Sequence, residues 1–124
     1  MDSGPLHVFR VTVRGQFHDL DVAPALRQAL LDAAGEHDIF RSAFTADGTF
    51  TYEPALVAFN LRYEVRRRGD DAHQAALDEG IERAAAYLAG RNISHRHLRA
   101  SAADMADMWR AAVTMIAHRS RATP

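Results

Sequence analysis

The sequence predicts a single α+β domain in which an antiparallel sheet has its helices packed on one face. Residues 8–14 and 57–66 alternate apolar and polar side chains, which is the pattern of strands with one buried face. One segment between these strands and one after them repeat apolar residues at helical spacing. The length of 124 residues, with 48% hydrophobic and 25% charged residues, fits one core that needs no disulfides.

The first strand, residues 8–14, is predicted to end at Gly15, and a helix is predicted to follow it. Asp21 is placed to cap this helix, and Pro24 lies in its first turn, where a missing N–H costs nothing. Gly35 is a natural C-terminal stop. The apolar positions of the helix are Val22, Leu26, Ala29, Leu30 and Ala33.

A hairpin is predicted after this helix. Residues 43–46 and 49–53 favour strands and flank Asp47-Gly48, which is a strong hairpin signal. The longest strand, residues 57–66, follows a second turn and places four large side chains on one face. These are Phe59, Leu61, Tyr63 and Val65.

A second helix is predicted from Asp70-Asp71, whose charges suit its positive end, to Gly90. Gly80 would allow this helix to approach the sheet closely. The expected buried stripe consists of Leu77, Ile81, Ala84 and Leu88.

The last strand is predicted at residues 94–102, and a C-terminal helix follows residues 101–104, which resemble a capping box. Without the short strand before Asp47, the order is β-α-β-β-α-β plus that helix. This is the split βαβ arrangement of ferredoxin-like folds, with both main helices on one sheet face. We expect one domain with loose termini at residues 1–7 and 120–124, and a dimeric assembly of the α/β-barrel type.

The other sheet face is predicted to be polar, and three interpretations of it stay open. It is a solvated face held by cross-strand ion pairs, a subunit interface, or a platform for anions or nucleic acid. The strand aromatics alternate onto the core side, which argues against the stacked bases of an RNA platform. We therefore expect a homo-oligomer with no nucleic-acid partner. The face comprises Arg10, Thr12, Arg14, Thr49, Thr51, Glu53, Asn60, Arg62, Glu64, Arg66, His97 and Arg99.

The composition excludes several kinds of chemistry. The absence of Cys excludes disulfides and thiolate catalysis, and the absence of Lys excludes Schiff-base chemistry. No apolar run is long enough for a bilayer and no leader opens the chain, so we expect a cytoplasmic protein with no membrane partner. His95 and His97 are expected to point the same way, but no third ligand has suitable spacing. We therefore expect no metal, and no motif indicates a cofactor.

Three residues are candidate catalytic groups. His37, between two carboxylates, is either part of a helix-end turn or a general base that a neighbouring carboxylate orients. Tyr52 and Tyr63 lie on the core face of neighbouring strands. They are either packed core residues with hydrogen-bonded hydroxyls, or phenols that orient a substrate in a pocket between sheet and helices.

Five residues are candidates for substrate binding. Arg62 or Arg99 would stabilise an enolate or a carboxylate, although alternation points Arg62 away from Tyr63, so that a shared site needs a dimer or a bulge. The stripe of Met105, Met108 and Trp109 is either a docked helix, the wall of a ligand pocket or a dimer contact.

Several short segments resemble a known family. They are FRVTVRG at residues 9–15, EHD at 36–38, AFT at 43–45, GTFTY at 48–52, and LRASA with DMADMW at 98–109. Together they resemble a family of small actinobacterial proteins classed as a domain of unknown function, over residues 9–109. The resemblance implies no catalytic residue, because the family has no established activity. The specific 98–109 segment is interpreted as a strand–helix junction that places Trp109 near a pocket or a partner.

Two functions are compatible with these sequence features. The first is a cofactor-independent enzyme, of the cyclase, isomerase or monooxygenase type, which acts on a small organic molecule in bacterial specialised metabolism. This expectation rests on analogy with small ferredoxin-like dimers. The alternative is a non-catalytic ligand-binding or assembly module that acts as a homo-oligomer.

Overall fold

The fold is a four-stranded antiparallel sheet with helices, seen in a computed structural model that describes residues 4–109. The strands are β1 (Leu6–Phe17), β2 (Thr49–Tyr52), β3 (Ala58–Arg68) and β4 (His95–Asp104). The helices are α1 (Pro24–Asp32) and α2 (Ala72–Gly90), with three short turns of 3₁₀-helix, η1 (Leu20–Val22), η2 (Ala34–His37) and η3 (Ile39–Arg41). The expected α+β class and the order β-α-β-β-α-β are confirmed.

The strands pair in the order β2-β3-β1-β4, and all pairs are antiparallel. The two long strands β1 and β3 form the centre, where Val11 lies opposite Tyr63. β1 begins at Leu6, two residues before the predicted start, so residues 6–7 belong to the sheet and not to a loose terminus. Its alternation is as expected, because Phe9, Val11 and Val13 are buried.

The prediction of a strand at residues 43–46 is wrong. Only Thr45 forms a β-bridge there, and its partner is Tyr63 of β3, in parallel orientation. The Thr45 hydroxyl accepts a hydrogen bond from the N–H of Gly48, and the Thr49 hydroxyl donates to the carbonyl of Ala43. Because the hydroxyls of Thr45 and Thr49 form hydrogen bonds with backbone groups of the turn, these groups are not available for a hairpin with β2, and the segment lies along β3.

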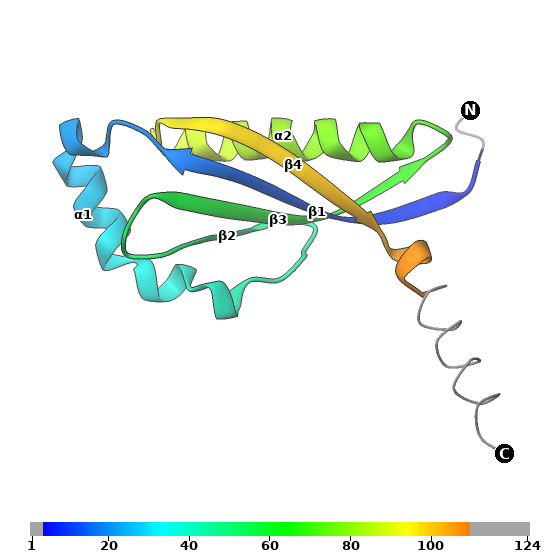
Figure 1. Cartoon of the computed structure of the whole chain (residues 1–124), viewed down its shortest axis with the longest axis horizontal. Coiled ribbons are helices and arrows are strands. Elements are labelled where there is room, and N and C mark those ends of the chain that lie inside the picture. Colours follow the sequence, from blue (N-terminus) through cyan, green and yellow to red (C-terminus); the bar gives the residue numbers. More distant parts are fainter. Residues whose placement is uncertain (1–3, 110–124) are drawn as a thin grey trace, which may run out of the picture.

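α2 lies along the sheet, and Figure 1 shows it running beside β4 and β1 over most of its length. Its buried residues recur at every fourth position, and all but the last are small: Ala72, Ala76, Gly80, Ala84 and Leu88. A Cβ atom at Gly80 would lie 2.7 Å from Cγ1 of Val11, so glycine is needed for this close approach. The predicted stripe was one position off at Leu77 and Ile81, which are half-buried.

α1 is shorter than predicted, because it begins at Pro24 and ends at Asp32. The expected cap, Asp21, lies in η1, and the helix starts from Ala23 without a side-chain cap. Figure 1 places α1 across the end of the sheet, where Leu30 is its buried residue.

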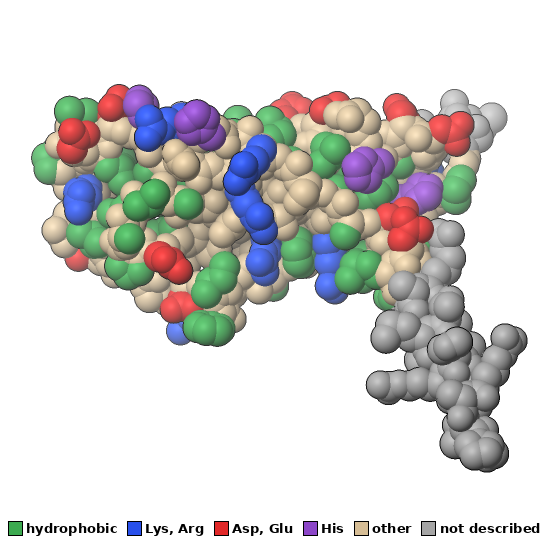
Figure 2. Space-filling view, in the orientation of Figure 1, with side chains coloured by type: hydrophobic (Ala, Val, Ile, Leu, Met, Phe, Trp, Pro, Cys, Tyr) green, Lys and Arg blue, Asp and Glu red, His purple; other side chains and the backbone are tan. Residues whose placement is uncertain are grey.

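Within residues 4–109, neither α1 nor α2 packs on the second sheet face, which is polar, as predicted. Figure 2 shows arginine side chains in a steep column near the middle of the molecule. Thr51, which was predicted to lie on this polar face, differs from the other residues of the face because it is buried, with 2% of its surface exposed. Whether two copies pair through this face stays a prediction.

Residues 105–109 are helical, so the predicted C-terminal helix begins where it was expected. Its remaining predicted residues and the predicted loose end at residues 120–124 lie outside the described residues. None of the described helices is both long enough and apolar enough to cross a membrane.

Candidate functional site

A cleft of about 240 Å³ lies at the β2 edge of the sheet, on the side of the core aromatics. Residues of β2, β3, η2, α2 and the loop before β2 line it. Its ionisable side chains are Glu36, His37, Arg41, Asp47, Tyr63 and Tyr87. Two of the three predicted catalytic residues, His37 and Tyr63, therefore line one cleft.

The imidazole of His37 has a defined orientation. His37 is the last residue of η2, and its Nδ1 lies 2.9 Å from the carbonyl oxygen of Phe50 in β2. Because a carbonyl oxygen only accepts, Nδ1 has the hydrogen, and Nε2 of the neutral ring retains its lone pair. The predicted orienting carboxylate is therefore replaced by a backbone carbonyl, and the Asp38 side chain instead accepts from the N–H of Phe40.

Tyr52 supports this imidazole and does not line the cleft. The two rings are stacked, with centroids 5.3 Å apart and an interplanar angle of 27°. The Tyr52 hydroxyl donates to the carbonyl oxygen of Leu30 at 2.6 Å, which satisfies a carbonyl in the last turn of α1. Burial raises the pKa of Tyr52, so the phenol stays protonated and keeps this bond at neutral pH. This is the hydrogen-bonded core role that the sequence left open for it.

Tyr63 and Tyr87 place two phenols in the cleft, and neither hydroxyl has a hydrogen-bond partner among residues 4–109. Burial raises the pKa of Tyr63, while the Arg83 guanidinium, 4.6 Å from the ring centroid, opposes the shift. Burial likewise raises the pKa of Tyr87, against the opposing charge of Arg91. Both phenols are therefore protonated at neutral pH and can donate a hydrogen bond to a ligand.

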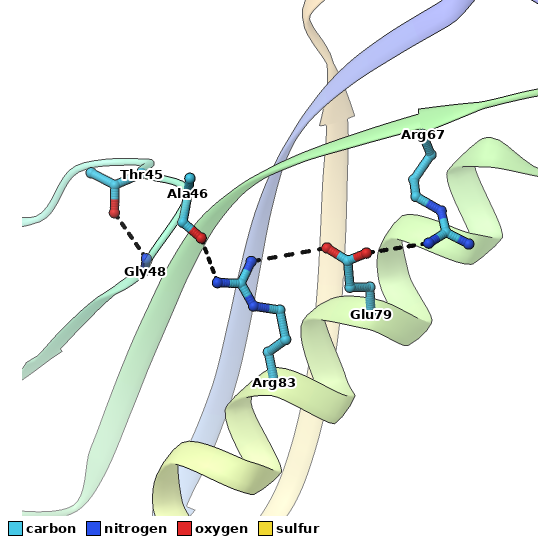
Figure 3. A network of polar contacts seen from close by, with 6 residues as sticks. All are labelled: Thr45, Ala46, Gly48, Arg67, Glu79 and Arg83. Atoms are coloured by element: carbon cyan, nitrogen blue, oxygen red, sulfur yellow. Dashed lines mark hydrogen bonds and ion pairs between the residues drawn. The ribbon is translucent and has the colours of Figure 1, made fainter.

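The loop that borders the cleft is attached to α2 by an arginine (Figure 3). Arg83 donates to the carbonyl of Ala46 and lies 3.9 Å from Glu79, which also pairs with Arg67 at 3.3 Å. Gly48 has a φ of 91°, and a Cβ atom there would lie 2.2 Å from Cε1 of Tyr63. The turn thus holds the Tyr63 ring in place by direct contact.

The predicted arginines lie on the opposite face of the sheet. The guanidinium carbon of Arg62 is 5.1 Å from the ring centroid of Phe44, and that of Arg10 is 5.4 Å from the same ring. Arg99 lies opposite Arg14 at the β1–β4 pairing. The structure therefore does not bring Arg62 or Arg99 together with His37, as alternation indicated for Arg62.

Met105, Met108 and Trp109 follow the end of β4, the edge strand farthest from β2 in the sheet order. Trp109 is 65% exposed and Met108 45% exposed. The structure does not place these residues in the cleft, and their predicted binding role stays a prediction.

The expectation that His95 and His97 point the same way is wrong. A bulge in β4 changes the alternation between them, so that His95 contacts the core ring of Phe59 while His97 is exposed beside Arg99. Within residues 4–109, no three His, Asp or Glu side chains are placed to hold a metal ion.

Sequence reasoning missed Tyr87, Arg83 and the role of Gly48 in the cleft. Tyr87 lies one position before the buried Leu88 and follows three alanines in α2. The sequence offered one signal for Tyr87, which is a large phenol in an alanine-rich helix, four residues after an arginine. The sequence could not show that the Tyr87 side chain points toward β2, because periodicity alone does not determine how the helix is oriented on the sheet.

Comparison with curated proteins and with solved structures finds no match. The model of one protein family matches residues 1–114, nearly the whole chain, and includes every residue of the cleft. The chain belongs to this family, the family of unknown function DUF6204.

Proposed function

We propose that this chain is a cofactor-independent enzyme that moves a proton on a small neutral carbonyl compound, as an isomerase or a cyclase does. The observation that supports this most is the imidazole of His37, whose Nδ1 hydrogen-bonds to the Phe50 carbonyl at the border of a cleft. Two phenols line this cleft whose hydroxyls have no hydrogen-bond partner among the described residues. A neutral imidazole nitrogen is the commonest general base, and a phenol O–H stabilises a developing oxyanion.

The proposed step begins with a substrate that has an acidic C–H beside its carbonyl. Nε2 of His37 takes this proton, the C–H electron pair becomes the C=C bond of an enolate, and the hydroxyl of Tyr63 donates to the enolate oxygen. The imidazolium then returns the proton to the second carbonyl oxygen of a dicarbonyl substrate, so that a C–H bond is exchanged for an O–H bond and the keto form becomes its enol isomer. This sequence needs no electron acceptor, whereas a monooxygenase would need O₂ as co-substrate, so we favour the isomerase and cyclase chemistry.

The charge around the cleft supports a neutral substrate. Glu36, Asp47 and Arg41 line the cleft with exposed side chains, and the guanidinium groups of Arg83 and Arg91 lie against the rings of Tyr63 and Tyr87. Carboxylates and guanidinium groups are both present, so neither sign of ligand charge is strongly favoured, while the two tyrosine rings offer apolar surface. We propose a compact dicarbonyl compound as the substrate class.

The strand order and antiparallel pairing support a ferredoxin-like assignment. On that analogy we also propose a cytoplasmic homo-oligomer of bacterial specialised metabolism. The alternative is a ligand-binding or assembly module, which the uncovered sheet face supports. Native mass spectrometry of the purified protein tests the oligomer, and saturable ligand binding without chemical turnover would favour the alternative.

The first experiment needs no substrate. Two-bond ¹H–¹⁵N NMR spectra report which imidazole nitrogen of His37 has the hydrogen in the neutral ring. We expect Nδ1–H, with Nε2 unprotonated. An Nε2–H ring would break the bond to the Phe50 carbonyl and refute the assignment of the base.

The second experiment measures deuterium incorporation from D₂O into a panel of neutral 1,3-dicarbonyl compounds. We expect exchange above the buffer rate, loss of that increase in His37→Gln, and a reduction of about tenfold or more in Tyr63→Phe. His18→Gln is the matched control, because His18 lies exposed at the end of the sheet and outside the cleft. Equal rates in His37→Gln and the wild type would exclude His37 as the base.

A further inference from the structure

A second candidate site lies on the open face of the sheet, at the bulge between β1 and β4. Arg14 lies opposite Arg99 and Gln16 lies opposite Arg96, so two residues of β4, His97 and its neighbour, face one residue of β1. His97 has a φ of 59°, in the left-handed region that glycine usually occupies at such a bulge. A side chain with a Cβ atom is strained there, and strained backbone is concentrated at functional sites.

A groove of about 460 Å³ runs along this bulge. Its polar side chains are Arg14, Gln16, Asn60, His97 and Arg99, and none of the described residues that line it has a carboxylate. Each of these five side chains can donate hydrogen bonds. The groove therefore suits a ligand that only accepts hydrogen bonds, which is the property of an oxyanion.

The two arginines of the groove are themselves unfavourable neighbours. Arg14 and Arg99 are directly opposite each other on adjacent strands, an arrangement that repels for like charges. Neither has an ion pair among residues 4–109. A bound anion would remove this repulsion. An anion site at the bulge would therefore explain both the pairing of Arg14 with Arg99 and the strained backbone of His97.

The charge of the face extends beyond the groove. Arg62 and Arg10 lie on the same face, both against the ring of Phe44, and Figure 2 shows arginine side chains in a steep column near the middle of the molecule. On this face Glu64 lies opposite Arg10 and pairs with Arg66 at 3.3 Å, whereas the arginines at the bulge have no carboxylate opposite them in the described strands, so the unbalanced positive charge is concentrated at the groove.

We propose that the groove binds the phosphoryl group of a small organic phosphate monoester. Two guanidinium groups match the charge of about −2 on such a group near neutral pH, whereas a single carboxylate has a charge of −1. Forked N–H groups from Arg14 and Arg99 reach two oxygens, and His97 and Asn60 donate to the rest. This site is on the opposite sheet face from the His37 cleft and does not depend on the function proposed for that cleft.

The test uses inorganic phosphate as the probe for the full-length protein, with binding measured by titration calorimetry and by amide NMR shifts at constant ionic strength. We expect one saturable site with shifts at the bulge, and affinity reduced about tenfold or more in Arg14→Gln and in Arg99→Gln. Arg27→Gln, which removes the same charge from exposed α1, should bind like the wild type. No saturable binding, or an equal loss in Arg27→Gln, would overturn the proposal.

A third variant separates ligand binding from folding. His97→Gly should raise the melting temperature, since glycine accepts the left-handed backbone, and should weaken phosphate binding. A variant that is less stable than the wild type would overturn the argument from strain. Succinate, a dicarboxylate of the same charge, serves as the competing ligand, and tighter binding of succinate than of phosphate would overturn the assignment to a phosphoryl group.

Discussion

Replacing Gly48 with alanine should disturb the cleft through the ring of Tyr63. Gly48 has a φ of 91°, and the added Cβ atom would lie 2.2 Å from Cε1 of Tyr63, a ring with 2% of its surface exposed. The backbone strain costs about 1–2 kcal/mol, and overpacking a buried ring adds about 1–3 kcal/mol. The free energy of unfolding should therefore fall by about 2–5 kcal/mol.

Gly69→Ala provides the matched control. Gly69 has a φ of 97°, but the nearest atom to its added Cβ, Oδ1 of Asp71, would lie at an ordinary 3.5 Å. The two variants share the backbone strain, so the difference between them isolates the contact with Tyr63. We expect Gly48→Ala to be less stable than Gly69→Ala by about 1–3 kcal/mol. Urea denaturation followed by far-UV circular dichroism measures this difference, and equal midpoints with equal slopes would refute the assigned contact.

Three further predictions concern stability. Gly80→Ala should be less stable than Gly90→Ala by about 1–3 kcal/mol in urea, because only the former adds a Cβ within 3 Å of the sheet; equal stability would contradict the packing of α2. Tyr52→Phe should lower the free energy of unfolding by about 1–3 kcal/mol, because the buried Leu30 carbonyl loses its partner; an unchanged midpoint would show that water replaces the hydroxyl. Burial raises the pKa of all three tyrosines above 10.0, so their protonated forms favour the folded state. The contribution of the tyrosines to stability should be constant below about pH 10 and be lost as the pH rises above it, and tyrosinate absorbance from the folded protein below pH 10 would contradict this.

The sheet was predictable because its signal is local and repeated. The alternation of residues 8–14 and 57–66 placed the large apolar side chains of β1 and β3 on the core face, where the structure has them. The errors arose where side chains form hydrogen bonds with backbone groups that a strand would use, and where close packing determines which residues of a helix are buried. Thr45 takes the N–H of Gly48 and so prevents a hairpin, and close approach at Gly80 moves the buried stripe of α2 toward small residues.

The candidate site was predictable only in part, for a related reason. Two predicted residues, His37 and Tyr63, come from different elements that both reach the β2 edge. The group that orients His37 could not be predicted from the sequence. It is the backbone carbonyl of Phe50, and every residue type has a backbone carbonyl. Tyr87 required the orientation of a helix relative to the sheet, which depends on how the buried stripe of that helix packs.

The two edges of the sheet differ in how they resist pairing with another chain. β2 has four residues, and its Phe50 carbonyl already accepts from His37. β4 has ten residues, but the bulge at His97 interrupts its pleat, and Arg96 and Arg99 flank that bulge. Short length, an occupied carbonyl, a bulge and positive charge each hinder the addition of a foreign strand. Deleting His97 would restore regular alternation to β4 and leave a long straight edge, so the same strained residue that borders the groove also protects the chain from edge-to-edge aggregation.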